Sequence, residues 1–343
     1  MSIIIFKPKQ VTKKFLAVLP ERIRVVVSER FGLGPDGTRK TLESIGQKYG
    51  VTRERIRQIE DFGLKSIQKS DVYKDEQAVF DNLREALVEY GGGVAPENHF
   101  FNHVSKDEST QNHLHLLLVL GEPFEKKKED EKFVHRWIVE ESMAKTVHDA
   151  LERLVSGLKE DELITEDDLL ERFYGHLSGV PSEYRNETIA RRWLSLSKMI
   201  GTNPLGEWGI ASSPNVNARG MRDYAFLVIR RHGSPMHFTE VAKEITKLFG
   251  KKAHTATCHN ELIKDGRFVL VGRGLYALTE WGYARGIVRD VISDVLKEHG
   301  ALSKEEIIDK VMQERYVKPN TIIVNLQNGN YFKKTDEGDY TLA

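Results

Sequence analysis

The stretch from Thr41 to Ile67, TLESIGQKYGVTRERIRQIEDFGLKSI, decides how the first part of this 343-residue chain folds. Its first half predicts a short helix whose inner face carries Leu42, Ile45 and Gly46. Gly50 ends that helix, because glycine accepts the left-handed conformation of a helix C-cap. Thr52 is placed to cap a second helix, since its hydroxyl can accept a hydrogen bond from the amide three residues on. The stretch therefore predicts a helix-turn-helix.

The second predicted helix has an apolar inner face and a polar outer face. The inner positions are Ile56, Ile59, Leu64 and Ile67. The outer positions in the first two turns are Arg53, Glu54, Arg55, Arg57 and Gln58. Arginine can bind guanine through two hydrogen bonds, glutamine can bind adenine in the same way, and glutamate can accept from cytosine. The start of the second helix faces the base edges in such motifs, so these residues and Thr52 form the candidate DNA-binding site.

This stretch resembles region 4 of the sigma-70-type sigma factors, the part that reads the minus-35 promoter element. The resemblance covers Val11 to Lys69 and is carried by TRERIRQIE in the second helix and by RFGLG at residues 30–34. It implies that Arg53, Glu54, Arg55 and Gln58 contact bases or phosphates. The sequence departs from the family at Ser44, where an acidic residue or glutamine is usual. Phe62 and Gly63 replace a usual lysine-alanine pair, so the activator contact of that lysine does not carry over.

Composition indicates a soluble, globular protein of several domains, since 40% of the residues are hydrophobic and 30% are charged. The single cysteine, Cys258, excludes an intramolecular disulfide and a cysteine-based zinc finger. No apolar run approaches the ~20 residues that a membrane-spanning helix needs. The opening SIIIF is too short for a signal peptide. We therefore expect a cytoplasmic, nucleoid-associated protein with no membrane contact.

The formal net charge is zero, but the charge is unevenly distributed. Counted as Lys+Arg minus Asp+Glu, the balance is +8 for residues 1–70, −8 for 71–141, −4 for 142–217, +5 for 218–283 and −1 for 284–343. Basic modules attract phosphate and acidic modules are repelled by it. The first and fourth stretches are therefore the candidates for nucleic-acid binding.

Five modules are expected: 1–70, 75–141, 142–214, 218–283 and 284–343. The first is all helical, with helices expected at Val11–Leu19 and Pro20–Phe31 before the motif. The second has an expected helical face of Ala78, Leu83, Leu87 and Val88, a break at residues 91–93, a strongly apolar helix at residues 114–120, and two strands at residues 123–126 and 132–137. The third has a helical face of Val147, Leu151, Leu154 and Leu158 and a strand at residues 208–210. Residues 215–217 are the expected linker.

The fourth module shows the plan of a winged helix most clearly. Phe238 begins one expected helix and residues 255–264 form another. Two strands, 268–271 and 275–278, are joined by Gly272, Arg273 and Gly274, and glycine at a hairpin tip allows positive φ. Residues 221–283 resemble the HARE-HTH family, found in the delta subunit of bacterial RNA polymerase, restriction endonucleases and chromatin proteins. The runs PMHFTE and RFVLVGRGLYAL carry this resemblance.

The fifth module is expected to repeat the same plan. Its first helix would bury Ile287, Val291, Ile292, Val295 and Leu296. Ser303 and Glu306 form an expected capping box, residues 319–326 a third helix, and residues 331–333 and 339–342 a ribbon. The predicted fold class is thus mainly α with small β-ribbons, in a tandem array of helix-turn-helix and winged-helix domains.

Outside the first module, the candidate DNA contacts are Lys251, Lys252 and Arg273 of the fourth. Lys126 to Lys128 are interpreted as a solvated wing in an acidic module. His254, Cys258 and His259 lie close in sequence but lack a second ligand pair at zinc spacing, so no metal is expected. No phosphate-binding loop or nucleophile motif is present, and Asp167-Asp168 and Glu140-Glu141 are interpreted as helix caps and solvated faces. We expect no cofactor, no small-molecule substrate and no enzymatic activity.

These patterns predict a bacterial transcription protein that binds double-stranded promoter DNA of minus-35 type and RNA polymerase core. No counterpart of sigma region 2 is recognisable, so the chain is not expected to open promoters alone. The alternative is an adaptor of delta-subunit type that binds RNA polymerase through protein contacts and does not read DNA sequence.

Overall fold

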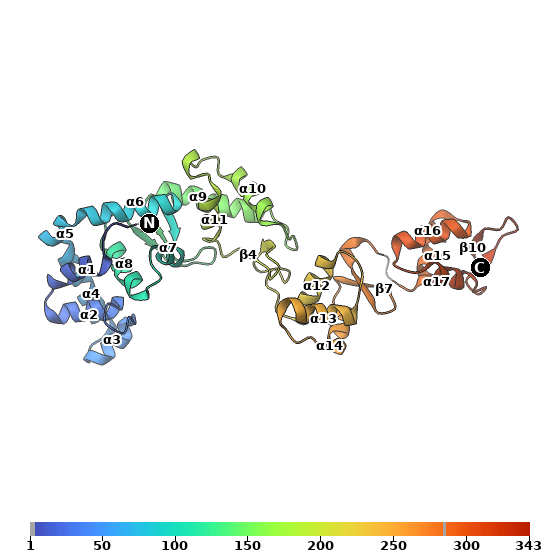
Figure 1. Ribbon diagram of the computed structural model, residues 1–343, viewed down its shortest axis with the longest axis horizontal. Coiled ribbons are helices and arrows are strands. Elements are labelled where there is room, and N and C mark those ends of the chain that lie inside the picture. The colour runs from blue at the N-terminus through green and yellow to red at the C-terminus, as the bar shows by residue number, and fades with distance from the viewer. Residues whose placement is uncertain (1–3, 284–285) are drawn as a thin grey trace. The chain divides into compact units, whose positions relative to one another are not determined.

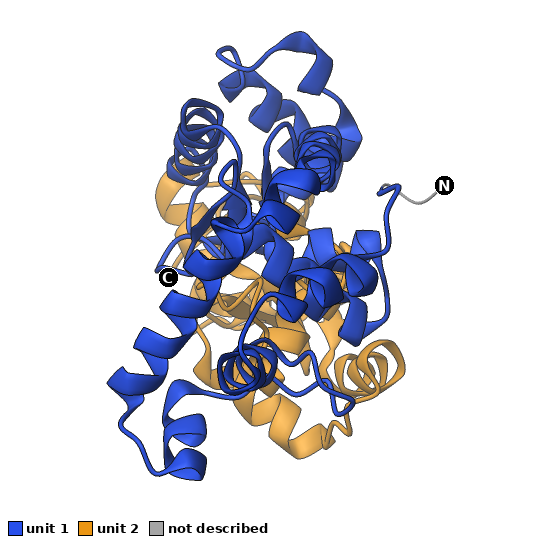
Figure 2. Ribbon diagram, turned by 90° about the vertical axis from the view of Figure 1, so that its left-hand side faces the viewer, with its two compact units in different colours: residues 1–201 blue, residues 202–343 orange. Residues whose placement is uncertain are grey.

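The computed structural model describes residues 4–283 and 286–343 (Figure 1). The chain divides into two compact units, residues 1–201 and 202–343 (Figure 2). Helices dominate both units, and the strands form small antiparallel sheets of two or three strands. The predicted fold class, mainly α with small β-ribbons, is confirmed.

The first module, called the head, consists of five helices. They are α1 (Pro8–Ala17), α2 (Glu21–Phe31), α3 (Leu42–Tyr49), α4 (Arg53–Gln68) and α5 (Asp71–Asp75). Pro8 opens α1 in the first turn, where its missing N–H costs no hydrogen bond. Pro20 was expected inside α2 but is its N-cap, so α2 begins at Glu21.

The second module has the order helix, strand, helix, helix, strand, strand. Its elements are α6 (Gln77–Gly91), β1 (Val94–Pro96), α7 (Glu97–Val104), α8 (Glu108–Leu120), β2 (Glu125–Lys127) and β3 (Arg136–Ile138). The strands pair in the order β1-β3-β2, with Trp137 of β3 opposite Ala95 on one side and Lys126 on the other. The expected inward position Ala78 is wrong, because this residue is exposed and Val79 and Phe80 are buried instead.

The head and the second module share one hydrophobic core. The buried cluster runs from Ile4 to Trp137 and includes Phe15 and Ile67 of the head together with Leu114 and Leu117 of α8. Helix α8 contacts α1, α2 and α4 (Figure 1). It is buried on all sides because its own module covers one face and the head covers the other. The core therefore continues through the boundary expected at residues 70–75.

The third module contains three helices and two short strands. They are α9 (Glu141–Ser156), α10 (Glu166–His176), the 3-10 helix η1 (Ser182–Tyr184), α11 (Glu187–Leu194), β4 (Ile200–Thr202) and β5 (Trp208–Ile210). Trp193 of α11 is fully buried and donates from Nε1 to the Gly91 carbonyl at 2.8 Å. A Cβ on Gly92, where φ is +61°, would lie 3.1 Å from the Trp193 ring. The glycines at 91–93 thus let the chain turn against this indole.

The fourth module repeats the element order of the second. It comprises α12 (Met221–His232), β6 (Met236–His237), α13 (Phe238–Phe249), α14 (Thr255–Lys264), β7 (Phe268–Gly272), β8 (Leu275–Leu278) and the 3-10 helix η2 (Thr279–Trp281). Its strand order, β6-β8-β7, matches β1-β3-β2 of the second module position by position. The expected helix at 255–264 and the hairpin around Arg273 are confirmed.

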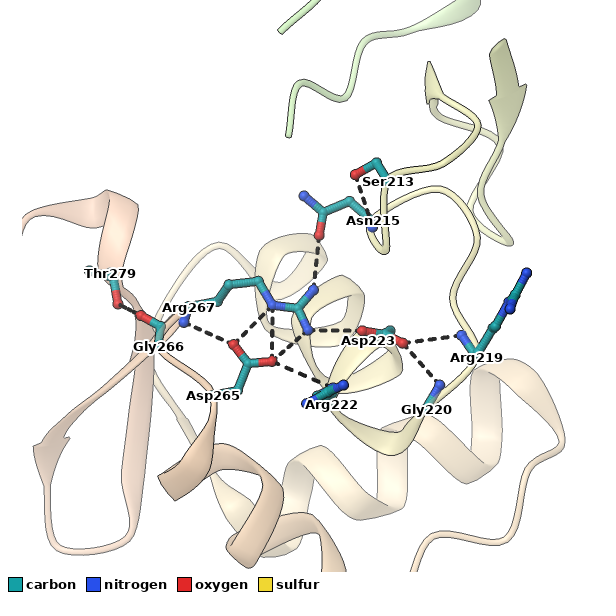
Figure 3. A network of polar contacts seen from close by, with 10 residues as sticks. All are labelled: Ser213, Asn215, Arg219, Gly220, Arg222, Asp223, Asp265, Gly266, Arg267 and Thr279. Atoms are coloured by element: carbon teal, nitrogen blue, oxygen red, sulfur yellow. Dashed lines mark hydrogen bonds and ion pairs between the residues drawn. The ribbon is translucent and has the colours of Figure 1, made fainter. Parts of the chain in front are cut away.

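The segment before α12 is bound to the fourth module by the Arg267 guanidinium. Arg267 donates to Asp265, to Asp223 at 2.9 Å and to Asn215 at 3.0 Å (Figure 3). Asp223 in turn accepts from the backbone N–H groups of residues 219 and 220. Asn215 and Val216 are buried. Residues 215–217, expected as a linker, are therefore packed into the second unit.

The fifth module is a smaller version of the same plan. Its elements are α15 (Val288–His299), α16 (Lys304–Glu314), α17 (Pro319–Leu326), β9 (Phe332–Lys334) and β10 (Tyr340–Leu342). An isolated bridge from Leu302 to Tyr340 takes the place of a first strand. The predicted capping box of Ser303 and Glu306 is present. Ile287, expected in the core, is instead the exposed N-cap of α15.

Candidate nucleic-acid interface

Three local features set the geometry of the α3–α4 motif. Thr41 caps α3 by accepting from the Ser44 N–H at 3.1 Å, and Thr52 caps α4 by accepting from the Arg55 N–H at 3.2 Å. Gly50 ends α3 with a φ of +65°. These contacts confirm the predicted helix-turn-helix.

The turn between the two helices also requires Gly46. A Cβ on this residue would lie 2.7 Å from the Val51 carbonyl oxygen, closer than atoms pack. Glycine therefore allows α3 to approach the start of α4.

The inner and outer faces of α4 are as expected. Ile56 is 1% exposed and Ile67 is fully buried, so this face seats the helix on α2 and α3. All six candidate residues of the motif are exposed, namely Thr52, Arg53, Glu54, Arg55, Arg57 and Gln58. Their side chains are free to enter a groove of DNA, and their contact with DNA remains a prediction.

A hydrogen-bonded network joins four of these side chains. Arg57 donates to both carboxylate oxygens of Glu54, at 2.9 and 2.8 Å. The amide of Gln58 donates to Glu54 at 3.4 Å and accepts from Arg55 at 3.2 Å. The hydrogen bonds from Arg57 lower the pKa of Glu54. Glu54 is therefore anionic at neutral pH and neutralises Arg57.

Arg53 and Arg55 are the remaining cations of this face. Within the part of the chain that the structure describes, neither makes an ion pair with a carboxylate. Their guanidinium groups therefore need no carboxylate displaced before they meet phosphate or guanine.

Phe62 and Gly63, the departures from the family pattern, lie on different sides of α4. Gly63 is buried where α4 crosses α2, and a Cβ there would lie 2.8 Å from a methyl group of Ile23. Phe62 is 58% exposed on the outer face, two turns beyond Arg55. The pair therefore combines a close helix crossing with an exposed ring.

The third helices of the second and third modules face inward. Five leucines of α8 are fully buried: Leu114, Leu116, Leu117, Leu118 and Leu120. In α11, Arg192 donates to the Tyr90 carbonyl at 2.5 Å and lies 4.0 Å from the centre of the Tyr90 ring. Arg191 forms ion pairs with Glu166 and Glu187. Neither helix offers a free polar face to DNA.

Lys126, interpreted from sequence as part of a solvated wing, is instead engaged with the protein. Its ammonium group lies 2.5 Å from the Glu97 carboxylate and 5.5 Å from the centre of the Trp137 ring. Glu97 is buried and also accepts from the Trp137 indole at 2.8 Å. Lys127 pairs with Glu125 and Glu141. The second module thus uses these lysines to hold its own sheet.

Helix α14 of the fourth module is exposed along one face. Lys251 and Lys252 are exposed just before it, and Arg273 is exposed at the tip of the β7–β8 hairpin. The Lys251 ammonium group lies 4.4 Å from the centre of the Tyr224 ring, which holds its stem against α12. The structure places these three residues in the second unit and the α4 residues in the first. They are therefore two separate candidate surfaces.

Sequence reasoning missed the polar side chains of α14 itself. His254, Thr255, Thr257 and Asn260 are exposed, while Cys258 and Leu262 are buried. The signal was available, because the polar residues occupy the face opposite the buried Cys258 and Leu262 at helical spacing. They follow the two lysines in the chain and extend that surface along the helix.

The third helix of the fifth module differs from α4 and α14. Helix α17 has the sequence PNTIIVNL and carries no charged residue, and Val324 on it is 60% exposed. It therefore lacks the cations that supply most of the affinity for phosphate.

No other class of site emerges from the described residues. No group of three or more His, Cys, Asp or Glu side chains there could hold a metal ion. Cys258 is buried, and burial raises the pKa of its thiol to about 11, so it is not a thiolate at neutral pH. Within the described residues, no helix is both long and apolar enough to cross a membrane.

Comparison with known proteins agrees with the geometry of the head. Residues 15–69 match the family model for sigma-70, region 4. Residues 219–281 match the HARE-HTH model, a helix-turn-helix domain described from ASXL proteins and restriction endonucleases. Both resemblances, in the expected order, are thereby confirmed.

One curated relative is the RNA polymerase sigma factor RpoD of Helicobacter pylori (strain ATCC 700392 / 26695). The match is 48% identical over 50 residues, which is 15% of this chain and 8% of that sigma factor. The chain therefore shares only a small part of that protein's length. Together, the helix-turn-helix, its exposed polar face and the two family matches support a DNA-binding role related to transcription.

Proposed function

We propose that this protein binds promoter DNA of minus-35 type through the N-terminal half of α4 and acts in the initiation of transcription or its regulation. One observation carries the proposal. The six polar residues from Thr52 to Gln58 are exposed on a helix whose opposite face is firmly seated, in the segment that matches sigma-70 region 4.

The side chains of this face suit different parts of the DNA. Arg55 and Gln58 lie one turn apart and are hydrogen-bonded to each other, so they approach the same base pairs. Arg53, in the first turn, is suited to a phosphate or guanine. Glu54 can accept from cytosine once Arg57 turns to the backbone. A good two-bonded contact to a base contributes roughly 1–3 kcal/mol of discrimination.

The fourth module supplies a second DNA-binding surface in this proposal. Lys251, Lys252 and Arg273 would bind phosphates on either side of α14, and the exposed polar face of α14 would enter a groove. The charge balance of +5 for residues 218–283 supports phosphate binding. The second and third modules have no such role, because α8 and α11 are occupied within the protein.

RNA polymerase core is the proposed protein partner, on the basis of the likeness to a sigma factor. The head's apolar face is already covered by α8. A polymerase contact would therefore use another surface, and the uncharged helix α17 with its exposed Val324 is the best candidate. In the adaptor alternative, this contact would exist without sequence-specific DNA binding.

Fluorescence anisotropy of the full chain tests the proposal. The chain would be titrated against a duplex with a minus-35-type element and against a shuffled duplex, each at two salt concentrations. Preference for the first duplex, with affinity falling steeply as salt rises, would support promoter reading. Equal binding to both, or none, would refute it. Co-elution with RNA polymerase core in that case would favour the adaptor.

A further inference from the structure

The loop of residues 32–40 connects α2 to the helix-turn-helix and determines how the motif is placed. It contains two residues with positive φ, Gly32 at +66° and Gly37 at +62°. Its end is tied to α2 by a hydrogen bond from the Lys40 N–H to the Glu29 carbonyl at 3.0 Å. Because Thr41 caps α3 directly after this loop, a shift of the loop would shift α3 and α4.

Asn112 of α8 binds this loop from outside the head. Its amide nitrogen donates to the Gly32 carbonyl at 3.0 Å and to the Gly37 carbonyl at 2.7 Å. Its amide oxygen accepts from Arg39 Nε at 2.6 Å. The residue is 3% exposed. Both hydrogens of the amide and its oxygen are therefore used on three points of a single loop.

The fit around Asn112 is close. A Cβ on Gly32 would lie 2.8 Å from the Asn112 amide nitrogen and 2.7 Å from the Gly37 carbonyl oxygen. The support behind Asn112 is rigid, since Leu114, Leu116 and Leu117 of α8 are fully buried. His113 beside it lies 2.5 Å from the Thr12 hydroxyl of α1, which fixes α8 against the head a second time.

We propose that Asn112 is a positioning residue for the recognition helix, so that the second module contributes to the head's choice of DNA sequence without touching DNA. The inference rests on the proposed function of α4. Hydrogen bonds to base edges depend on the placement of α4 in the groove, whereas contacts of long cationic side chains with phosphates tolerate displacement. Releasing the loop therefore costs sequence discrimination more than it costs affinity for DNA in general.

Asn112→Asp and Asn112→Ala in the full chain test this inference. Aspartate keeps the acceptor for Arg39 but loses both donors and turns an anionic oxygen toward two carbonyls; alanine removes all three hydrogen bonds without adding charge. The matched control is Gln68→Ala, because Gln68 also joins the head to α8, through the Leu120 carbonyl at 3.0 Å, but does not touch the loop. Each variant would be titrated against the minus-35-type duplex and the shuffled duplex.

We expect the ratio of the two affinities to fall at least tenfold in Asn112→Asp and about fivefold in Asn112→Ala. Affinity for the shuffled duplex should stay within twofold, and Gln68→Ala should keep the wild-type ratio. Hydrogen exchange should show faster exchange of the amides at residues 33–40 in the Asn112 variants. If Asn112→Asp does not fold, Asn112→Ala alone decides.

Two results would overturn the inference: a wild-type ratio in folded Asn112 variants, or an equal loss in Gln68→Ala. A wild-type chain that does not distinguish the duplexes would instead refute the proposed function. In that case, unchanged exchange of the loop in the Asn112 variants would refute the positioning role independently.

Discussion

Helices α8 and α14 occupy the same place in two modules with the same element order and the same strand order. Helix α8 is apolar and buried on all sides, and its neighbours are the head and its own sheet. Helix α14 buries Cys258 and Leu262 but exposes threonine, asparagine and lysine. The comparison teaches that the third helix of a winged-helix module is a position and not a function. The side-chain pattern decides whether it joins a core or faces a ligand.

The largest effect expected from this comparison is on stability. Leu117→Ala in α8 should lower the free energy of unfolding by about 2–5 kcal/mol, because it leaves a cavity in the shared core. Thr257→Ala in α14 should change it by about 0.5 kcal/mol or less, as for other exposed positions. Urea denaturation followed by circular dichroism measures both. Similar values for the two variants would contradict the contrast between the helices.

Arginines on α4 and α11 should separate binding from stability. Arg55→Ala is expected to weaken binding to the minus-35-type duplex by about 1–3 kcal/mol and to leave the stability unchanged. Arg192→Ala in α11 should leave DNA binding unchanged and lower the stability, since Arg192 binds the Tyr90 carbonyl and ring. Anisotropy and thermal melting of both variants measure this. Loss of DNA binding in Arg192→Ala would show that α11 reaches DNA.

Acid should destabilise the first unit through His115 of α8. Burial, with help from Lys126, Arg39 and Arg30, lowers the pKa of His115 to about 2. The unfolded chain binds a proton near pH 6.5 and the folded chain does not, so stability falls as pH drops below 6.5. From pH 7.5 to 5.5 we expect a loss of about 1.4 kcal/mol from this residue. His115→Gln should remove that part of the loss in urea titrations, and an unchanged pH dependence would contradict the assignment.

The smallest effect concerns the lysine before α14. Lys252→Ala should reduce the slope of log affinity against log salt by about 0.9, the value for one lost phosphate contact. Lys247→Ala is the control, because Lys247 lies on α13 and pairs with Glu244. Anisotropy at four salt concentrations gives the slopes. Equal slopes for wild type and Lys252→Ala would remove Lys252 from the DNA surface.

Local patterns predicted local structure well in this chain. The helix-turn-helix, its caps at Thr52 and Gly50, the helix at 255–264 and the Arg273 hairpin all follow from residues close together in sequence. A Thr cap or a Gly turn acts within four residues, so the sequence shows it directly. The site on α4 was predictable for the same reason, since its two faces alternate along one helix.

What the sequence did not reveal depends on distant contacts. The apolar run at residues 114–120 predicted a buried helix but not that the head would cover it. Asn112 looked like any polar residue near a helix start, because its partners lie 73 to 80 positions away. Residues 215–217 had the composition of a linker, and only the reach of Arg267 from 52 positions away binds Asn215. Periodicity carries no information about such partners.

The shared core also sets an order of events during synthesis. The ribosome releases the helix-turn-helix before it has made α8, so the surface around Phe15 and Ile67 has no cover at that stage. Translation from Lys69 to Trp137 takes roughly 3–14 seconds at the usual rates. During this interval the motif lacks both its apolar cover and the clasp of Asn112. We therefore expect a nascent chain to become competent for DNA only after the second module has emerged.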